Sequence, residues 1–549
     1  MRPPLLRLWL LVVAVAIFLN IGAYPLYDAD EGRNGEVGRE MAATNDYVMP
    51  RIDGMPYLDK PIVYFAAEAL AMEVLGPTEL AARLPAYLFT LLTAALLFWF
   101  ARRVWGESEA YVAAIVFLAM PLTLAFARTV IFDSALTFFM VAAIVAFYFA
   151  CHPERSEEAG RGSGANDVGV PPAAQVPRYA RNDQGKWTAI AWASMAFGVL
   201  TKGPVAIAVP LMIAIPFAIR RKTPRALISV LGIILFVVII APWVWAVSRV
   251  VPDFLHYVLV TETAQRLATK ALKRTGPPWY FIPYILGGAL PWCIAALMSW
   301  RRERRDELMT YAAFWVLIPF VFFSISQSKR PQYILPVMPA IALLVARFWT
   351  TEERRVRIAA QIAAILFLFI GSVLLAFPLL PVKMDPATAA GAHAAVIPMG
   401  IATLLGGLAF LRRKDLALIA LTIPIITIPL TANPLMRAIG ERRSAKSFVA
   451  QLPASQKVVA IESFTGSLAF YLRGPIDVVT NDAEEFTSNY IIRHYEQFAN
   501  DPASPVKRAV KPERGVVYIV RNNDAEHRAM LESQGFSVIA SGAHHVAYR

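Results

Sequence analysis

Residues 220–247 read RRKTPRALISVLGIILFVVIIAPWVWAV. A basic cluster, Arg220 to Lys222, is followed from residue 226 by an apolar run without a charged side chain. A helix of this length crosses about 30 Å of hydrocarbon, and basic residues gather on the cytoplasmic side of such spans. The stretch therefore predicts a transmembrane helix that enters the membrane from the cytoplasm.

The composition of the whole chain agrees with this stretch. Of 549 residues, 57% are hydrophobic and 17% are charged, whereas about a quarter of a soluble domain is charged. A net charge of +13 could indicate a nucleic-acid partner. However, the basic clusters lie between apolar runs at every second junction, which is the positive-inside pattern of a membrane protein. We therefore expect no nucleic-acid partner; the clusters are Arg2/Arg7, Arg102–Arg103, Arg220–Lys222, Arg301–Arg305, Arg354–Arg355 and Arg412–Lys414.

Run length and flanking charge predict a polytopic α-helical membrane protein with about 13 spans. The basic residues before the first span place the N-terminus in the cytoplasm, and an odd number of spans then places the C-terminus outside. Residues 1–433 would form the membrane domain. The expected spans are 5–24, 80–100, 109–127, 132–150, 187–201, 203–219, 226–247, 281–299, 309–326, 331–348, 357–378, 393–411 and 415–433.

Four segments outside these spans have distinct characters. The loops 24–79 and 248–280 are long, carry many charged residues and fall on the outer face. Residues 151–186 are rich in Glu, Arg, Gly, Pro and Asn, so they cannot bury a core and are expected to be a disordered cytoplasmic insertion. Residues 434–549 alternate short apolar runs with helical patterns, which predicts a small α/β domain outside the membrane.

The first long loop opens with Tyr27-Asp28-Ala29-Asp30-Glu31-Gly32-Arg33. Asp28-Ala29-Asp30 could be a metal motif that holds a nucleotide-sugar diphosphate. No nucleotide fold accompanies it, and the loop faces away from the cytoplasmic nucleotide pools. Loop carboxylates solvated by water are the other interpretation, because acidic residues beside a span are costly unless they face water or a site.

A longer series of motifs resembles the bacterial aminoarabinose lipid A transferases. That family is grouped with the protein O-mannosyltransferases among the GT-C membrane glycosyltransferases. The series runs in order over roughly residues 20 to 345. Its motifs are Asp30-Glu31-x-Arg33, Arg39-Glu40-Met41, Tyr57-x-Asp59-Lys60-Pro61, Ala82-Arg83-Leu84-Pro85, Phe132-Asp133, Leu200-Thr201-Lys202-Gly203, Glu262-x-x-Gln265-Arg266, Pro277-x-Trp279-Tyr280, Leu290-Pro291-Trp292 and Ser328-Lys329-x-Pro331-x-Tyr333.

The resemblance implies transfer of a sugar from a polyprenyl phosphate to an envelope acceptor on the periplasmic face, with inversion at the anomeric carbon. The lipid phosphate leaves with negative charge, so fixed cations are needed in a site shielded from water. Asp30, Glu31, Lys60 and Asp133 are implied as catalytic. The residues implied to bind the donor phosphate or the substrate are Arg33, Tyr57, Asp59, Lys202, Glu262, Arg266, Arg274, Lys329 and Tyr333.

Two departures from the lipid A branch bear on cofactors. The glutamate before the loop lysine is Asp59 here, and the histidine proposed to share a metal with it is Arg274. A guanidinium stays protonated and cannot ligate Zn²⁺, so we expect no metal. An ion pair between Arg274 and Asp59 could replace it.

Several alternatives stay open at this stage. A transporter or lipid flippase would also have many spans, but such proteins usually show internal repeats and ionisable residues inside spans. Among acceptors, a lipid A-like lipid, another envelope glycan and a protein are all compatible with the resemblance. Membrane lipids, the donor and one of these acceptors are the expected partners of a monomer.

Overall fold

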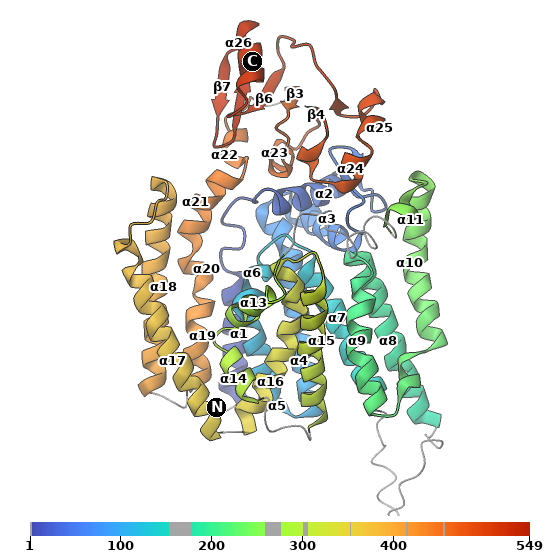
Figure 1. Ribbon diagram of the computed structural model, residues 1–549, viewed down its shortest axis with the longest axis vertical. Coiled ribbons are helices and arrows are strands. Elements are labelled where there is room, and N and C mark those ends of the chain that lie inside the picture. Colours follow the sequence, from blue (N-terminus) through green and yellow to red (C-terminus); the bar gives the residue numbers. More distant parts are fainter. Residues whose placement is uncertain are drawn as a thin grey trace, which may run out of the picture.

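The computed structural model describes residues 3–152, 178–258, 276–299, 306–351, 353–412, 416–453 and 456–549. Its elements form three layers, a helical bundle, a middle layer built mainly from the first long loop, and a C-terminal sheet (Figure 1). The predicted insertion 151–186 and the second long loop, 248–280, lie largely outside the described residues. The N- and C-termini lie at opposite ends of the long axis (Figure 1).

The bundle consists of apolar helices that run along the long axis (Figure 1). Its helices are α1 (Pro3–Phe18), α4 (Glu79–Val104), α5 (Glu107–Leu118), α6 (Pro121–Ala127), α7 (Asp133–Ala150), α8 (Arg178–Lys202), α9 (Val205–Arg220), α10 (Val230–Val250), α13 (Phe281–Gly288), α14 (Cys293–Ser299), α15 (Glu307–Ile325), α16 (Met338–Thr351), α17 (Glu353–Ala376), α18 (Pro386–Arg412), α19 (Ala417–Ile426), α20 (Ile428–Thr431) and α21 (Asn433–Arg443). The 3₁₀ turns η2 (Pro224–Leu227), η4 (Pro331–Val337) and η5 (Phe377–Leu379) connect some of them.

The described residues contain seven helices that are long and apolar enough to cross a membrane, or ten if each bent helix pair is one span. The expected number of about 13 would also need the shorter helices α1 and α9, together with α8. That number stays a prediction.

Two expected spans are broken rather than straight. The helices α5 and α6 meet at 66°, and α13 and α14 meet at 103°. Pro121 begins α6, and Pro291 lies between α13 and α14. Proline lacks the N–H that a continuing helix requires, so each helix ends before it. Run length alone predicted single helices here because it does not account for these breaks.

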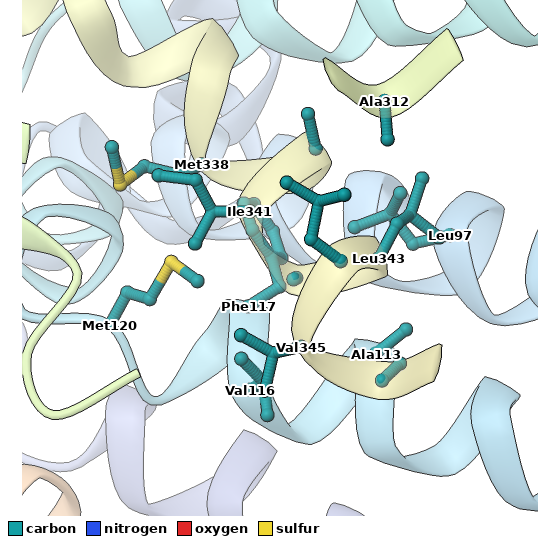
Figure 2. Packing of buried hydrophobic residues seen from close by; sticks show 14 of the residues in the cluster. Leu97, Ala113, Val116, Phe117, Met120, Ala312, Met338, Ile341, Leu343 and Val345 are labelled. Atoms are coloured by element: carbon teal, nitrogen blue, oxygen red, sulfur yellow. The ribbon is translucent and has the colours of Figure 1, made fainter. Parts of the chain in front are cut away.

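The centre of the bundle is tightly packed. Figure 2 shows Val116 and Phe117 of α5 beside Ile341 and Val345 of α16, with Leu97 of α4 beside Leu343, all of them buried. Small residues at neighbouring positions, such as Ala113 and Ala312, let the helices approach closely, as is common in membrane bundles. This core fixes the helices whose ends carry the candidate site.

The first long loop, residues 24–79, forms most of the middle layer. It contains α2 (Asp30–Thr44), β1 (Arg51–Ile52), β2 (Met55–Pro56) and α3 (Val63–Leu75). Within the part of the second loop that the structure describes, α11 (Phe254–His256) lies at the top of α10.

A buried ion pair anchors the start of the first loop. Arg83 is 0% exposed and donates to both carboxylate oxygens of Glu31, at 2.9 and 2.8 Å. Its remaining N–H groups donate to the backbone carbonyls of Ile21, Tyr24 and Pro25. A buried charge must be paired and hydrogen-bonded to be tolerated, and this cluster meets that requirement. It holds α2 at a fixed position above α4.

The C-terminal region forms a mixed sheet with the strand order β5-β4-β3-β6-β8-β7. Its strands are β3 (Val458–Ile461), β4 (Ile476–Val479), β5 (Val506–Lys507), β6 (Val517–Arg521), β7 (Val538–Ser541) and β8 (His545–Tyr548). The helices and the 3₁₀ turn around it are α22 (Lys446–Val449), α23 (Gly466–Leu472), η7 (Glu484–Phe486), α24 (Asn489–Arg493), α25 (Tyr495–Asn500) and α26 (Ala525–Ser533). The strands β5, β4, β3 and β6 are parallel, and β8 and β7 continue the sheet antiparallel.

The carboxyl edge of this sheet faces the first long loop. Asp28 accepts a hydrogen bond from the backbone N–H of Ser467 at 2.8 Å and another from its hydroxyl. The helices α2 and α23 approach so closely that a Cβ on Gly32 would meet the backbone of Ser467, and one on Gly466 would meet the backbone of Arg33. The C-terminal region therefore packs directly on the loop that carries Asp30.

Candidate active site

A cavity of about 570 Å³ lies where α7, α8, α9, α10 and α15 meet the first long loop. Most of its wall is apolar, with residues such as Met140, Phe236 and Phe322. At one end the wall carries Lys60, Asp59, Asp133, Lys202 and Tyr333. The cavity therefore combines a largely apolar wall with a charged end.

The ends of α7 and α8 bring Asp133 and Lys202 together in this cavity. Asp133 is the first residue of α7 and Lys202 is the last of α8. Lys202 Nζ lies 2.5 Å from Asp133 Oδ1 and 4.9 Å from the centre of the Tyr333 ring. The other Asp133 oxygen is buried without a hydrogen-bond partner among the described residues. Lys202 thus contributes a cation to the cavity, held by a carboxylate on one side and an aromatic ring on the other.

Lys60 lies in the first loop at the same charged end. Its ammonium group donates to the backbone carbonyl of Asp59 at 2.6 Å, and both residues line the cavity. The sequence placed Lys60 and Lys202 separately at membrane junctions. In the structure they belong to one cavity.

The Asp59 carboxylate is occupied by hydrogen bonds from protein groups. It accepts hydrogen bonds from the Tyr257 hydroxyl at 2.7 Å and from the backbone N–H of Asn489 at 2.9 Å. The Ser488 hydroxyl and the Tyr490 N–H add weaker bonds at 3.3 Å. These partners come from the second long loop and from the start of α24, so Asp59 joins both to the residue beside Lys60.

Asp30 does not line this cavity and belongs to a separate ion-pair network. Its carboxylate is 2.7 Å from Arg33 Nη2 and 3.0 Å from Arg330 Nη1. Arg33 also donates to the Thr487 hydroxyl at 2.8 Å, and its guanidinium lies 5.9 Å from the centre of the Tyr57 ring. The Asp30 side chain is 39% exposed, so it can still meet a substrate.

The charge network acts on the protonation of Asp30. Burial by itself would raise the pKa of this carboxyl group, but the positive charges of Arg33 and Arg330 outweigh burial and lower the pKa below its ordinary value. Asp30 is therefore ionised throughout the neutral range.

Two further predicted residues have structural contacts in this region. Both oxygens of Glu31 bond to Arg83, and its carboxylate also accepts from the backbone N–H groups of Tyr27 and Val130 at 3.1 Å. Lys329 is 8% exposed and donates to the backbone carbonyl of Ser326, which lines the cavity. Glu31 thus supports the loop beside Asp30, and Lys329 lies behind the cavity wall.

The predicted site residues Glu262, Arg266 and Arg274 lie outside the described residues, and so does the expected Arg274–Asp59 ion pair. Their roles stay predictions. Among the described residues, no group of three His, Cys, Asp or Glu side chains has the arrangement to hold a metal ion.

Arg330 is the main residue of this network that the sequence did not single out. It occupies the unassigned position in the motif Ser328-Lys329-x-Pro331. The sequence did contain one signal for Arg330. It is a second cation directly beside Lys329, at a junction where basic residues are scarce. No signal in the sequence pointed to Thr487 or to the backbone of α24.

Replacing Asp59 with alanine should loosen the contact between the first loop and α24. The substitution leaves the Tyr257 hydroxyl and two backbone N–H groups without their acceptor, at a cost of about 1–3 kcal/mol. We expect a lower midpoint of thermal unfolding and about a tenfold weaker binding of the polyprenyl phosphate that the resemblance implies. Asp501→Ala removes a loop carboxylate near α25 and serves as the control; equal effects of the two changes would contradict a special role for Asp59.

Comparison with known proteins confirms the resemblance found in the sequence. Residues 59–164 match a family model described as dolichyl-phosphate-mannose-protein mannosyltransferase. The chain is 30% identical over 358 residues to an undecaprenyl phosphate-alpha-4-amino-4-deoxy-L-arabinose arabinosyl transferase of Yersinia enterocolitica. This alignment covers 64% of the present chain and 60% of the relative. A protein of the same name from Aeromonas hydrophila is 30% identical over 335 residues, with 60% and 57% covered. The similar region thus spans about 60% of the length of these relatives.

The fold matches over nearly the whole chain. The crystal structure of ArnT from Cupriavidus metallidurans bound to undecaprenyl phosphate superposes with a TM-score of 0.81, at 24% identity, covering 98% of this chain and 97% of that one. The apo structure of the same protein superposes with a TM-score of 0.77. The chain is a multi-span membrane protein with this GT-C fold.

Proposed function

We propose that the chain is an integral-membrane glycosyltransferase that transfers a sugar from a polyprenyl-phosphate donor to an envelope acceptor. The cavity of about 570 Å³ carries this proposal, because its apolar wall suits a polyprenyl chain and its charged end suits a phosphate. Lysine binds phosphate as a point charge, and both Lys60 and Lys202 line that end. The names of the relatives and the undecaprenyl phosphate bound in the similar crystal structure point to the same donor class.

In this reaction the bond between the anomeric carbon and the lipid phosphate breaks, and an acceptor oxygen bonds to that carbon from the opposite face. The leaving phosphate gains negative charge, which preorganised cations stabilise most effectively in a low-dielectric cavity. Lys202 and Lys60 would supply that stabilisation. Attack from the opposite face inverts the anomeric centre.

The state of Asp30 favours an acceptor that is already ionised. An efficient general base has a pKa near the working pH, whereas Arg33 and Arg330 lower the pKa of Asp30. A phosphate oxygen needs no base, so Asp30 and its two arginines would orient the reactants. We infer a phosphate-bearing lipid such as lipid A as the acceptor, in preference to a hydroxyl of a protein or glycan.

The chain would work as a monomer in the bacterial inner membrane, with the N-terminus in the cytoplasm and the C-terminus in the periplasm. The two termini lie at opposite ends of the molecule, which supports opposite sides of the membrane (Figure 1), and the basic clusters between the apolar runs favour the N-terminus as the cytoplasmic one. The catalytic loops would then face the periplasm. We propose that no metal takes part, because Asp59 already bonds to protein groups and position 274 is an arginine.

The test is transfer by the purified chain in lipid nanodiscs, with undecaprenyl phosphate-4-amino-4-deoxy-L-arabinose as donor and lipid A as acceptor, followed by mass spectrometry of the lipid. We expect a mass increase of one sugar that persists with EDTA. Asp30 stays ionised from pH 5 to 8 and therefore gives no pH dependence in that range. The rate should rise through about pH 6, because the acceptor phosphate loses its second proton there. No transfer to lipid A, to glycan or to protein acceptors would overturn the proposal.

A further inference from the structure

The C-terminal sheet has a topological switch point that faces the first long loop. From β3 the chain moves outward to β4 and β5, then returns to place β6 on the other side of β3. The loops after β3 and β6 therefore turn away from each other and leave a crevice at the carboxyl edge. Ligands of open α/β sheets bind at such crevices.

Two adjoining cavities occupy this edge. One, of about 540 Å³, is lined by Arg443, Arg521 and His544 among others. The second, of about 400 Å³, shares Arg521 with the first and is otherwise lined largely by acidic and neutral polar residues. Asp28 lines both, and it also lines a smaller cavity that reaches Asp30. Through Asp28 the crevice thus adjoins the cavity at Asp30, the proposed reaction centre.

The larger cavity has two arginine side chains in its lining that could bind an anion. Arg443 and Arg521 line it from different elements, the end of α21 and the end of β6. Within the described ranges, no hydrogen bond or ion pair joins either guanidinium group to another side chain, so both are available to a ligand.

Arg521 shares the second cavity with Glu462, Asp482, Glu484 and Glu485, and its positive charge partly offsets the burial that raises the pKa of Glu485. Arg443 does not line that acidic cavity.

Asp28 is the only acidic lining residue of the larger cavity in the described part of the chain, and both of its oxygens accept hydrogen bonds from Ser467. His545 Nε2 donates to the Ser463 carbonyl at 3.1 Å, and burial lowers the pKa of His545 to about 4, so it is neutral. His544 is exposed at the opening.

We propose that this crevice binds an anionic group of the acceptor, a phosphate or a carboxylate, through Arg443, Arg521 and His544. Arginine presents two parallel N–H groups that match the oxygens of such anions. An acceptor held here would extend past Asp28 to Asp30, with its reacting oxygen facing the donor. The assignment rests on the proposed transferase function, and it gives the C-terminal region a direct part in acceptor recognition.

The experiment compares the parent protein with Arg443→Gln, Arg521→Gln and the double variant, all as full-length chains in nanodiscs. The steady-state parameters for lipid A are measured together with the affinity for undecaprenyl phosphate. We expect each single change to raise KM for lipid A by about tenfold and the double change to raise it further. The kcat and the affinity for undecaprenyl phosphate should stay the same, which a general folding defect would not allow.

Arg442→Gln is the matched control, because Arg442 belongs to the same helix but pairs with Asp385 outside the crevice. It should leave KM unchanged. An unchanged KM in the double variant would overturn the assignment while leaving the transferase proposal intact.

A second arm separates an acceptor site from a site for a free anion. Inorganic phosphate is titrated into each protein by calorimetry. Weak binding to the parent that the double variant loses supports the crevice as an anion site, and no binding to the parent overturns it. Loss of phosphate binding with no change in KM for lipid A would show a site for a free anion and overturn the link to the acceptor. If the parent transfers no sugar, the proposed function fails, and the phosphate titration alone decides whether the crevice binds anions.

Discussion

Replacement of Lys202 by methionine is expected to slow sugar transfer by about 10²–10³-fold, because one preorganised charge at a leaving group contributes on this order. Lys202 lines the charged end of the donor cavity and pairs with Asp133 at 2.5 Å. The measurements are the transfer rate and the affinity for undecaprenyl phosphate. Both should fall, since Lys202 would meet the phosphate in the ground state and in the transition state.

The same substitution also leaves Asp133 as an unpaired charge that is 2% exposed. Breaking a buried pair costs about 3–5 kcal/mol of stability, so lower activity could reflect unfolding. The double variant Lys202→Met/Asp133→Asn removes both charges and should regain most of the unfolding midpoint without regaining activity. Recovery of activity in the double variant would contradict a role of Lys202 at the phosphate.

Lys383→Ala provides a control for lysine removal. Lys383 is exposed in the connection between α17 and α18, outside the lining of the donor cavity. Its replacement should leave transfer and donor affinity at parental values.

The sequence could predict the positions of the individual cations but not their partners. Lys202 and Asp133 were assigned to membrane junctions because apolar runs begin or end there. Their pairing requires α7 and α8 to lie side by side, and a single sequence read alone contains no pattern for that contact. The same holds for Asp59, whose partners at Ser488 to Tyr490 are 429 to 431 positions away.

The limits of run length as a predictor appear at Pro121 and Pro291. Both proline residues lie within long apolar runs that read as single spans. In the structure each marks a sharp bend between two short helices. Hydropathy measures the cost of placing a segment in lipid, and it does not report whether the backbone hydrogen bonds of one helix continue through it.

Arg330 illustrates a third limit, because a sequence motif can point to one residue when its neighbour makes the contact in the site. The motif drew the interpretation to Lys329, yet Lys329 bonds to a backbone carbonyl behind the wall and Arg330 reaches Asp30. A side chain's direction depends on the local backbone, here the start of the 3₁₀ turn η4. Spacing within a sequence motif does not determine it.

Asp30→Asn should reduce kcat for transfer by about 10²-fold or more, the range expected when a charge that orients or activates the reactants is lost. Asparagine keeps the size and one acceptor oxygen, but it removes the negative charge that holds Arg33 and Arg330 together. The two guanidinium groups would then repel each other, and the groups around Asp30 would lose their alignment. The loss should be the same from pH 5 to 8, since the parental Asp30 is ionised over that whole range.

Donor affinity distinguishes this effect from that of Lys202. Asp30 does not line the donor cavity, so the affinity of the Asp30→Asn variant for undecaprenyl phosphate should equal that of the parent. Asp46→Asn, which alters another carboxylate of the same loop that faces an arginine, should leave kcat unchanged. If Asp30→Asn keeps near-parental kcat, the reaction centre does not lie beside Asp30. If it loses donor affinity to the same extent as activity, Asp30 acts by supporting the donor cavity, and the place of the acceptor must be sought elsewhere.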